Sequence, residues 1–522
     1  MYDAGAMRRA FDLLRERAPW LAVAIASYAY RLPALLGAGT TNSDAAIVGL
    51  QAMHVLRGEW SPFLFGSGYQ TSFDSFVAAL FFAVLGATPL ALMLSSLTLH
   101  VALTGLAFAT LARHAPRWTA AILVAPLVLS SSVVHGYALY PPRQLALTLA
   151  FAAAWTIDGA SRARRPAARF CAGGAVAALA CCADPYALLL LPLTALLAAL
   201  SSRDGEASWR TSARRLGAAA LGGAAGIAPL VALLASPHAV TGETRLTTET
   251  IPHNAKLLVD VCFPWVMSAR VYYAHHMADW GPWDAPAPVR ALQIAGAVIA
   301  IGGMLYGGAA VAMRSTPWPL RRLGLVGFAA LPLTVAAFLL SVMVMDLFST
   351  RYLVAIPLYL PFALAPLAAR LRPTILAGLL APHVVASALS GWMGYAPAVD
   401  GAAIRTGLVD DDVRLGAALR ERGVHHAIAD YWASYRLTLL YREDPIVVPS
   451  HAAQDRYAPY RAAVASAPAY AYIVDASRSE EPAAAVEARV RAEGAGDVER
   501  ITVGSFTAFI VRAAPSGAIV AR

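Results

Sequence analysis

Long apolar runs follow one another along most of the chain, separated by short breaks that are rich in arginine. Runs of roughly 18 to 23 residues can cross a hydrocarbon core of about 30 Å as helices. Because such runs fill residues 1–392, the pattern predicts a polytopic α-helical membrane domain there, with about 11 spans. The spans are expected at 18–37, 89–112, 117–134, 143–159, 168–183, 185–201, 214–235, 290–312, 322–345, 352–369 and 374–392.

If the first span runs outward, the breaks between the spans divide into inner breaks and outer loops. Every break on the inner side is then basic, as in "SRARRPAAR" and "RSTPWPLRR", which is the positive-inside pattern. The outer side receives two long loops, 38–88 and 236–289. The apolar run "SFVAALFFAVLG" in the first loop is too short to span comfortably, so we expect an interfacial or re-entrant helix there.

The character of the chain changes after the last predicted span. Residues 393–522 alternate amphipathic helical patterns with short β-rich runs, namely "HHAIADYW", "PIVVPS", "AYAYIVDA" and "ITVGSFTAFIVRAA". The helical stretch "DDDVRLGAALRERG" ends in a glycine, as helices often do. The pattern predicts a C-terminal α/β domain, and the odd number of spans places it on the extracytoplasmic side.

The composition agrees with a membrane protein and indicates which classes of partner to expect. Hydrophobic residues make up 58% of the chain and charged residues 14%, against roughly 25% charged in soluble domains. The net charge of +9 comes from the short membrane loops, so we expect membrane lipid and no nucleic acid as partners. All but one of the 41 basic residues are arginine, which is typical of a GC-rich bacterial genome. We therefore expect a multi-pass protein of the bacterial inner (plasma) membrane.

Two cofactor classes receive no support from the sequence. No glycine loop of the form G-x-x-x-x-G-K-[ST] occurs, which disfavours nucleotide-driven transport. No residue pattern supports a divalent metal, and we expect no metal site and no cofactor.

Ionisable side chains gather at the outer ends of the predicted spans. Such residues at membrane depth are costly and mark functional or paired positions. Arginines beside acids at the outer mouth of a bundle suit a reaction between a lipid-borne phosphate donor and a polar acceptor. The arginines hold the phosphate, and an acid deprotonates the acceptor hydroxyl. The candidates include Arg31, Asp44, His135, Arg143 and Arg351.

Asp44 allows two interpretations. It lies about one helical turn beyond the first span, at the start of the amphipathic stretch "SDAAIVGLQAMHVLRGEW". Ser43 and Asp44 are good helix caps, and a cap contributes roughly 0.5–2 kcal/mol without any chemistry. Arg31 has a similar alternative, because a long side chain near a helix end can snorkel to the interface. We expect Glu59 and Asp74 at the loop surface.

Three segments resemble GT-C type membrane glycosyltransferases, the superfamily of protein O-mannosyltransferases and aminoarabinose transferases. The first is "RLPALLGAGTTNSDAAIVGLQAMHVLRGEW", followed by "GYQTSFDSFVAALFFAVLGATPLALMLSSL". The second, "FSTRYLVAIPLYLPFALA", is similar to an Arg-Tyr-Leu-x-x-x-x-P segment of these enzymes. The third, "IADYWASYRLTLLYREDPIVV", resembles a stretch of the external domain in bacterial relatives. The resemblance implies a GT-C-like fold.

The resemblance also implies roles for individual residues. Asp44 matches the family's catalytic acid, which acts as general base on the acceptor. Arg351, with Tyr352, matches the position near the donor phosphate, and Arg31 would assist. The sequence departs from the pattern at Ala45, where a Glu often follows the Asp.

A second departure concerns the acid that the family often carries after the third span. It is missing from "SSVVHGYALYPPRQLALTLA", which offers His135, Tyr137 and Arg143 instead. Besides Asp44 as the catalytic base, the substrate-binding set expected from these patterns is Arg31, Arg143, Arg351, Tyr352 and His135.

We therefore expect a glycosyltransferase that uses a polyprenyl-phosphate sugar donor and an extracytoplasmic glycan, lipid or protein acceptor, with Asp44 as general base. The alternative is a non-catalytic transporter or binding protein for lipid-linked glycans on the same scaffold, which the missing second acid would favour. Transport predicts ionisable residues that face one another near the bilayer midplane. In this chain they lie at the predicted outer face, which favours the transferase.

Overall fold

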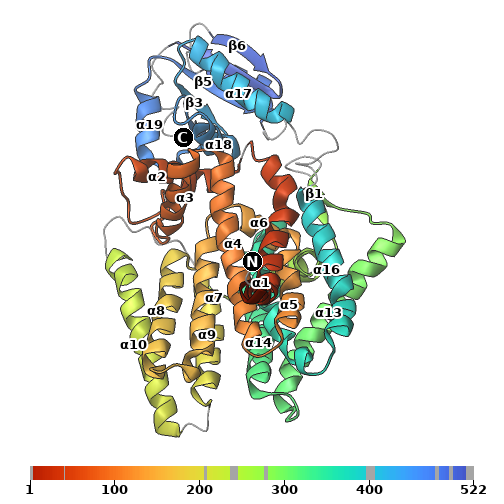
Figure 1. Ribbon diagram of the computed structural model, residues 1–522. Coiled ribbons are helices and arrows are strands. Elements are labelled where there is room, and N and C mark those ends of the chain that lie inside the picture. The colour runs from red at the N-terminus through yellow and green to blue at the C-terminus, as the bar shows by residue number, and fades with distance from the viewer. Residues whose placement is uncertain are drawn as a thin grey trace.

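The computed structural model describes residues 4–39, 41–204, 208–234, 245–274, 280–395, 406–476, 481–492 and 498–512. A bundle of long helices forms the lower part of the molecule in Figure 1, and a smaller α/β domain caps its upper end. Helices α2 (Ser43–Leu56) and α3 (Phe73–Leu85) of the first long loop lie between these two parts. The short apolar run of that loop is thus a separate helix, as predicted.

The bundle helices follow the predicted spans. They are α1 (Ala4–Leu36), α4 (Pro89–Ala112), α5 (Arg117–Val128), α6 (Ser132–Leu139), α7 (Gln144–Asp158), α8 (Pro166–Ala183), α9 (Ala187–Ser202), α10 (Trp209–Leu234), α13 (Ala287–Ala309), α14 (Trp318–Leu340), α15 (Ala355–Ala363) and α16 (Pro373–Tyr395). Within the described ranges, 6 helices are long and apolar enough to cross a membrane, or 7 if one bent pair counts as a span. The protein is therefore a polytopic helical membrane protein. The larger number of spans stays a prediction, since α7 and α9 have only 15 and 16 residues.

The predicted span 117–134 is wrong as a single helix. Helix α5 ends at Val128, and α6 leaves it at an angle of 86°. Pro126 lies in the last turn of α5, and the three serines 130–132 follow it, so the local chain favours a break over a continuous helix. The turn brings the far end of α6 beside the polar residues described below.

The predicted span 352–369 is also irregular. Short 3-10 segments, Leu347–Leu353 and Ala365–Ala369, flank α15 on either side. Pro357, Pro361 and Pro366 lack the N–H group that a continuous α-helix needs, which accounts for the irregularity. The whole stretch 347–369 remains apolar and long enough to cross a membrane.

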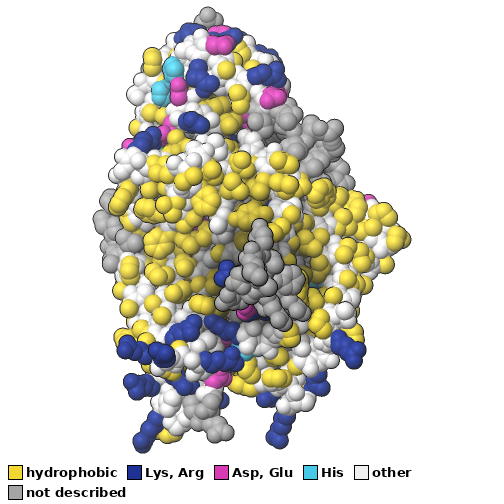
Figure 2. All heavy atoms as spheres, viewed as in Figure 1, with side chains coloured by type: hydrophobic (Ala, Val, Ile, Leu, Met, Phe, Trp, Pro, Cys, Tyr) yellow, Lys and Arg dark blue, Asp and Glu magenta, His cyan; other side chains and the backbone are white. Residues whose placement is uncertain are grey.

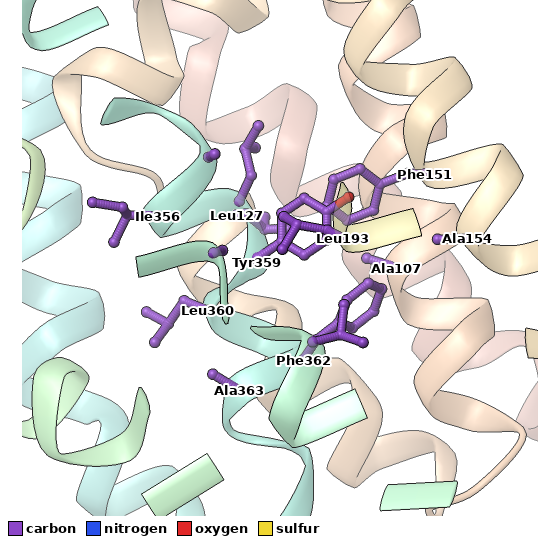
Figure 3. Packing of buried hydrophobic residues seen from close by; sticks show 14 of the residues in the cluster. Ala107, Leu127, Phe151, Ala154, Leu193, Ile356, Tyr359, Leu360, Phe362 and Ala363 are labelled. Carbon is purple, nitrogen blue, oxygen red and sulfur yellow. The ribbon is translucent and has the colours of Figure 1, made fainter. Parts of the chain in front are cut away.

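Large side chains and small residues alternate in packing the bundle. Figure 3 shows the ring of Phe151 on α7 against Tyr359 and Phe362 on α15, with ring centroids 5.1 and 5.6 Å apart. Helices α8 and α10 meet through their backbones, because a Cβ at Gly222 would lie only 1.9 Å from the carbonyl oxygen of Cys171. Close approach through small residues is the usual way that membrane helices associate.

Basic residues gather at the lower end of the bundle, and Figure 2 shows them below a broad hydrophobic band. Asp158 at the end of α7 is buried there and accepts from Arg322 of α14 (2.6 Å) and Arg113 after α4 (3.1 Å). Asp204 after α9 also pairs with Arg322. These contacts join the basic breaks at one end of the bundle, which confirms that they share a side.

The second long loop contains structure of its own. It holds α11 (Ile251–Leu257), a π-helical turn at Leu258–Cys262, α12 (Phe263–Val266) and the two-stranded antiparallel sheet of β1 (Tyr272–Ala274) and β2 (Trp280–Pro282). Residues 235–244 and 275–279 of this region lie outside the described residues.

The C-terminal domain is a mixed sheet with helices on it, as predicted. Its sheet has the order β4-β3-β5-β7-β6, with β3 parallel to β4 and β5, and with β7 antiparallel to β5 and β6. The last predicted strand is in fact a hairpin, because Gly504 adopts a φ of +57° between β6 and β7. The elements are α17 (Thr406–Glu421), β3 (His426–Ala429), α18 (Tyr431–Leu440), β4 (Ile446–Pro449), α19 (Ala458–Ala465), β5 (Tyr470–Asp475), α20 (Ala483–Ala492), β6 (Val498–Val503) and β7 (Phe506–Val511).

Helix α2 is buried on almost every side, although its sequence predicts an amphipathic helix. The α/β domain covers the face that would otherwise meet water, and Leu50 of α2, Leu92 of α4 and Tyr435 of α18 belong to one hydrophobic cluster. At Gly49, a Cβ would lie 2.9 Å from the side chain of Leu439. The α/β domain therefore shares a core with the first long loop. The domain boundary at 392/393 stays a prediction, and residues 396–405 lie outside the described residues.

Candidate active site at the junction of the two domains

Asp44 lies in the first turn of α2 but does not cap it. The cap is Asn42, whose Oδ1 accepts from the N–H of Ala45 over 2.8 Å. The half-buried carboxylate of Asp44 instead accepts from the hydroxyl of Tyr431 over 2.5 Å. Ser43 also turns away from the helix end and donates to the backbone carbonyl of Tyr431 over 2.6 Å. Asp44 is thus free of the capping role and faces the α/β domain.

Tyr431 and Arg456 form the wall that the α/β domain presents to Asp44. The guanidinium carbon of Arg456 lies 5.7 Å from the centre of the Tyr431 ring, and Arg456 donates to the carbonyl of Gly66 over 3.2 Å. Burial, and next the charge of Asp44, raise the pKa of the Tyr431 phenol well above its ordinary value. Tyr431 therefore remains a proton donor to the carboxylate across the physiological pH range.

A second polar group surrounds Arg143, at the N-cap of α7. Its Nε donates to Oδ2 of the buried Asp184 over 3.0 Å, and its Nη1 donates to the hydroxyl of Tyr137 over 2.8 Å. The backbone of Arg143 is left-handed, with φ of 101°, which is uncommon for a residue other than glycine. Residues held in such conformations cluster at functional sites, because the surrounding structure must stabilise them.

Arg351 and Tyr352 adjoin the Arg143 group. The hydroxyl of Tyr137 donates to the backbone carbonyl of Arg351 over 3.3 Å, and Tyr186 donates to that of Tyr352 over 3.1 Å. The exposed guanidinium of Arg351 donates to the Tyr352 hydroxyl over 3.2 Å and is close enough to Arg143 for the two charges to interact. The structure gives Arg351 no carboxylate partner among the described side chains. Two guanidinium groups side by side, one without a counter-ion, suit an anion.

Two acids that the sequence did not single out lie beside Arg143. Asp184 follows α8, and it supplies a carboxylate where the segment after the third span has none. Asp74 is not at the loop surface, as expected, but buried, and it accepts from the backbone N–H groups of Arg143 and Leu145 over 3.4 Å each. Burial, and next the nearby Asp184, raise the pKa of Asp74 to about 6. Neither acid has a local sequence signal, because each acquires its partner through the fold.

The two polar groups meet at consecutive residues of the loop between α2 and α3. Tyr69 lies near enough to Arg456 for an electrostatic interaction, and Gln70 donates to Asp184 over 2.8 Å. Consecutive residues of this loop therefore link the Asp44 group to the Arg143 group.

Arg31 and His135 form another, fully buried cluster. Arg31 donates to the carbonyl of Val128 (3.1 Å) and to Ser130 Oγ (2.8 Å), and so satisfies the C-terminal end of α5. The ring of His135 lies edge-on to Tyr30 at 5.1 Å. Of the expected substrate-binding set, the structure brings Arg143, Arg351 and Tyr352 together, and it holds Arg31 among backbone groups.

The described side chains include no group of three or more His, Cys, Asp and Glu residues that could hold a metal ion. The polar side chains at the junction are the half-buried carboxylate of Asp44, neighbouring phenols and guanidinium groups. Such a set can accept a proton from a hydroxyl and neutralise a phosphate.

Comparison with known proteins shows similarity to solved structures. The chain is similar to the crystal structure of ArnT from Cupriavidus metallidurans in the apo state, with a TM-score of 0.47 and 11% identity, over 95% of this chain and 98% of that one. It is also similar to the structure of the same ArnT bound to undecaprenyl phosphate, with a TM-score of 0.45 and 10% identity, over 96% and 100%. No protein-family model and no curated protein matches the chain.

Proposed function

We propose that the protein is a membrane glycosyltransferase that moves a sugar from a polyprenyl-phosphate carrier to an extracytoplasmic acceptor. The observation that carries this proposal is the link between Asp44 and the Arg143 and Arg351 pair through the loop at Tyr69 and Gln70. A base and a phosphate clamp are the two elements that a direct displacement at an anomeric carbon needs.

The donor side rests on the surroundings of Arg351. Met345 and Phe348, six and three positions before it in the chain, are exposed and apolar, so the segment that carries this charged group also presents apolar side chains. That combination suits a phosphate attached to a lipid chain. Arg143 would bind the phosphate from a fixed orientation, because Asp184 and Tyr137 already hold its Nε and Nη1.

Asp44 provides the acceptor side of the proposal. Its carboxylate takes the proton of the acceptor hydroxyl while the oxygen attacks the anomeric carbon of the donor sugar. The bond from that carbon to the phosphate oxygen breaks, and the polyprenyl phosphate leaves with its negative charge beside Arg143 and Arg351.

Orientation in the membrane follows from the basic lower end. Arginine-rich loops remain on the cytoplasmic side, so the junction and the α/β domain would lie outside the inner membrane of a bacterium. We propose about 11 spans, with the short helices α7 and α9 crossing as part of the bundle.

The test compares Asp44→Asn with Asp410→Asn, which changes an exposed carboxylate on α17. Purified protein receives a lipid extract of its native membranes, which supplies donors and lipid-linked acceptors, and mass spectrometry measures the undecaprenyl phosphate released. We expect Asp44→Asn to lose at least 100-fold in release, in line with roughly 10²–10⁴-fold for general base catalysis, and Asp410→Asn to lose nothing. Full activity of a folded Asp44→Asn variant would overturn the proposal.

The alternative of a non-catalytic binding protein makes a different prediction in the same experiment. It predicts that undecaprenyl phosphate binds to the purified protein but that neither wild type nor variant releases it from donors. Binding without release would therefore favour the alternative.

A further inference from the structure

Tyr431 connects Asp44 to a third residue, Arg456. The Tyr431 hydroxyl donates to Asp44 Oδ1 over 2.5 Å, although 387 positions separate the two residues. The guanidinium carbon of Arg456 lies 5.7 Å from the centre of the Tyr431 ring, close enough for its positive charge to act on the phenol. The phenol thus lies between a cation and a carboxylate, and its hydroxyl donates to the carboxylate.

This arrangement has two effects on a base. A cation near the phenol polarises the O–H group and strengthens its hydrogen bond to the carboxylate. A bond donated to the carboxylate favours the charged form, which is the form that can accept a proton. Because Oδ1 of Asp44 is occupied by Tyr431, the direction of the other carboxylate oxygen is set as well.

The α/β domain holds the side chains of Tyr431 and Arg456 in place. The cap of α18 is Asp430, whose Oδ1 accepts from the backbone N–H of Trp432 over 2.8 Å and so orients the first turn that carries Tyr431. The backbone N–H of Arg456 donates to the hydroxyl of Tyr435 over 2.6 Å. Ser43 beside Asp44 donates to the carbonyl of Tyr431, so the two helix starts are joined in both directions.

We propose that Tyr431 is a positioning residue for Asp44 and that Arg456 supports it, so that the α/β domain completes the catalytic site. The inference rests on the proposed function, since it concerns the same base. It goes further in assigning the α/β domain a direct part in the reaction, through a residue that never needs to touch the substrate.

The charged and titratable groups around Asp44 are few. Tyr431 and Arg456 face it from the α/β domain, and Tyr69 of the loop between α2 and α3 faces Arg456. Burial raises the pKa of the Tyr431 phenol, so the hydroxyl that faces Asp44 stays protonated near neutral pH.

The experiment measures the pH profile of undecaprenyl phosphate release for Tyr431→Phe and for its matched control Tyr441→Phe. Both substitutions remove one hydroxyl, at the start and at the end of α18, but the Tyr441 hydroxyl donates to the backbone carbonyl of Asp412 over 2.7 Å and not to Asp44. We expect Tyr431→Phe to lower release at neutral pH roughly tenfold, the loss of one hydrogen bond to a charged group. Its acid limb should move to higher pH, since the charged carboxylate is then less favoured.

Two further measurements separate positioning from folding. Binding of undecaprenyl phosphate should remain within about twofold of wild type in Tyr431→Phe, because the donor clamp lies on other residues. Arg456→Gln should move the acid limb in the same direction, and Arg456→Lys should restore part of the shift.

The inference is overturned if Tyr431→Phe keeps the wild-type pH profile, or if Tyr441→Phe shifts it equally. Either result can occur while Asp44→Asn is inactive, and then only the role of Tyr431 is lost. Activity in Asp44→Asn would instead remove the proposed function itself.

Discussion

The carboxylate of Asp184 holds the guanidinium of Arg143 by an Nε to Oδ2 hydrogen bond of 3.0 Å. A hydrogen bond from Nη1 to Tyr137 fixes the plane of the group. Arg143 is therefore oriented from two sides, whereas Arg351 is exposed and bonded only through Tyr352. We assign both arginines to phosphate binding. The function of Arg143 should depend more on the fixed orientation of its guanidinium group than that of Arg351 does.

Replacement of each arginine by lysine tests that difference. Arg143→Lys keeps the charge but cannot bond Asp184 and Tyr137 together while it binds a phosphate, so we expect undecaprenyl phosphate to bind roughly tenfold more weakly. Arg351→Lys should cost only about twofold, because an exposed cation acts mainly through its charge. Microscale thermophoresis in detergent measures both affinities, with Arg370→Lys near the basic end as the control. Equal losses in the two variants would contradict the prediction.

The contact between α2 and the α/β domain should depend on pH through Glu443. It accepts from Arg57 over 2.5 Å and from His54 over 2.7 Å, both at the end of α2. Burial alone would raise the pKa of Glu443, but the hydrogen bonds from His54, Arg57 and Tyr460 outweigh it and lower the pKa to about 2.

A carboxyl with a lowered pKa stabilises the folded state above its unfolded pKa of 4.5 and loses that contribution as the pH falls towards 2. We expect Glu443→Gln to be less stable than wild type by roughly 1–2 kcal/mol at pH 7, and the difference to shrink below pH 4.5. Thermal unfolding between pH 7 and pH 3 measures this. A difference in melting temperature that stays constant with pH would argue against the coupling.

Gly66 allows the loop between α2 and α3 to reach the α/β domain. Its φ is +67°, and an added Cβ would lie 2.5 Å from the Cα of Arg456. We expect Gly66→Ala to cost about 1 kcal/mol for the backbone conformation alone, plus the displacement of Arg456, and to lower undecaprenyl phosphate release.

Gly58 offers the matched control for this prediction. Its φ is also positive, at +84°, but nothing lies within 4 Å of an added Cβ. Gly58→Ala should therefore show the conformational cost without the loss of release. If both variants release undecaprenyl phosphate at the same rate, the contact between Gly66 and Arg456 has no functional part.

The ion pairs at the lower end of the bundle should matter for stability and not for the reaction. Asp158 is fully buried and paired with Arg113 and Arg322, so Asp158→Asn breaks a buried ion pair and leaves Arg322 with Asp204 alone, at a cost of roughly 3–5 kcal/mol. Glu16→Gln breaks the exposed pair with Arg117, which is worth about 0–1 kcal/mol. Melting temperatures should separate the two variants clearly. Affinity for undecaprenyl phosphate should be unchanged in both, and a loss in Asp158→Asn would link the two ends of the bundle.

The candidate site could be predicted only in part from the sequence. Asp44, Arg143 and Arg351 stand out because a charge beside an apolar run is costly wherever the run lies in the membrane. Asp184 is one more charge at the end of an apolar run, but nothing in the sequence pairs it with Arg143. Tyr431 and Arg456 do not stand out, since a tyrosine or an arginine in a polar segment is ordinary until its partner is known. Asp74 was expected at the surface, and its burial depends on α7, whose first turn lies against it.

The sequence alone predicts the membrane character of the chain, the placement of most helices and the sharing of one end by the basic breaks. These properties depend on local composition, because the length of an apolar run and the charge of its flanks act over about 20 residues. The burial of α2 and the contact of Asp44 with Tyr431 depend on the tertiary structure. The last joins residues 387 positions apart, and only the docking of the α/β domain on α2 brings the donor within 2.5 Å of the carboxylate.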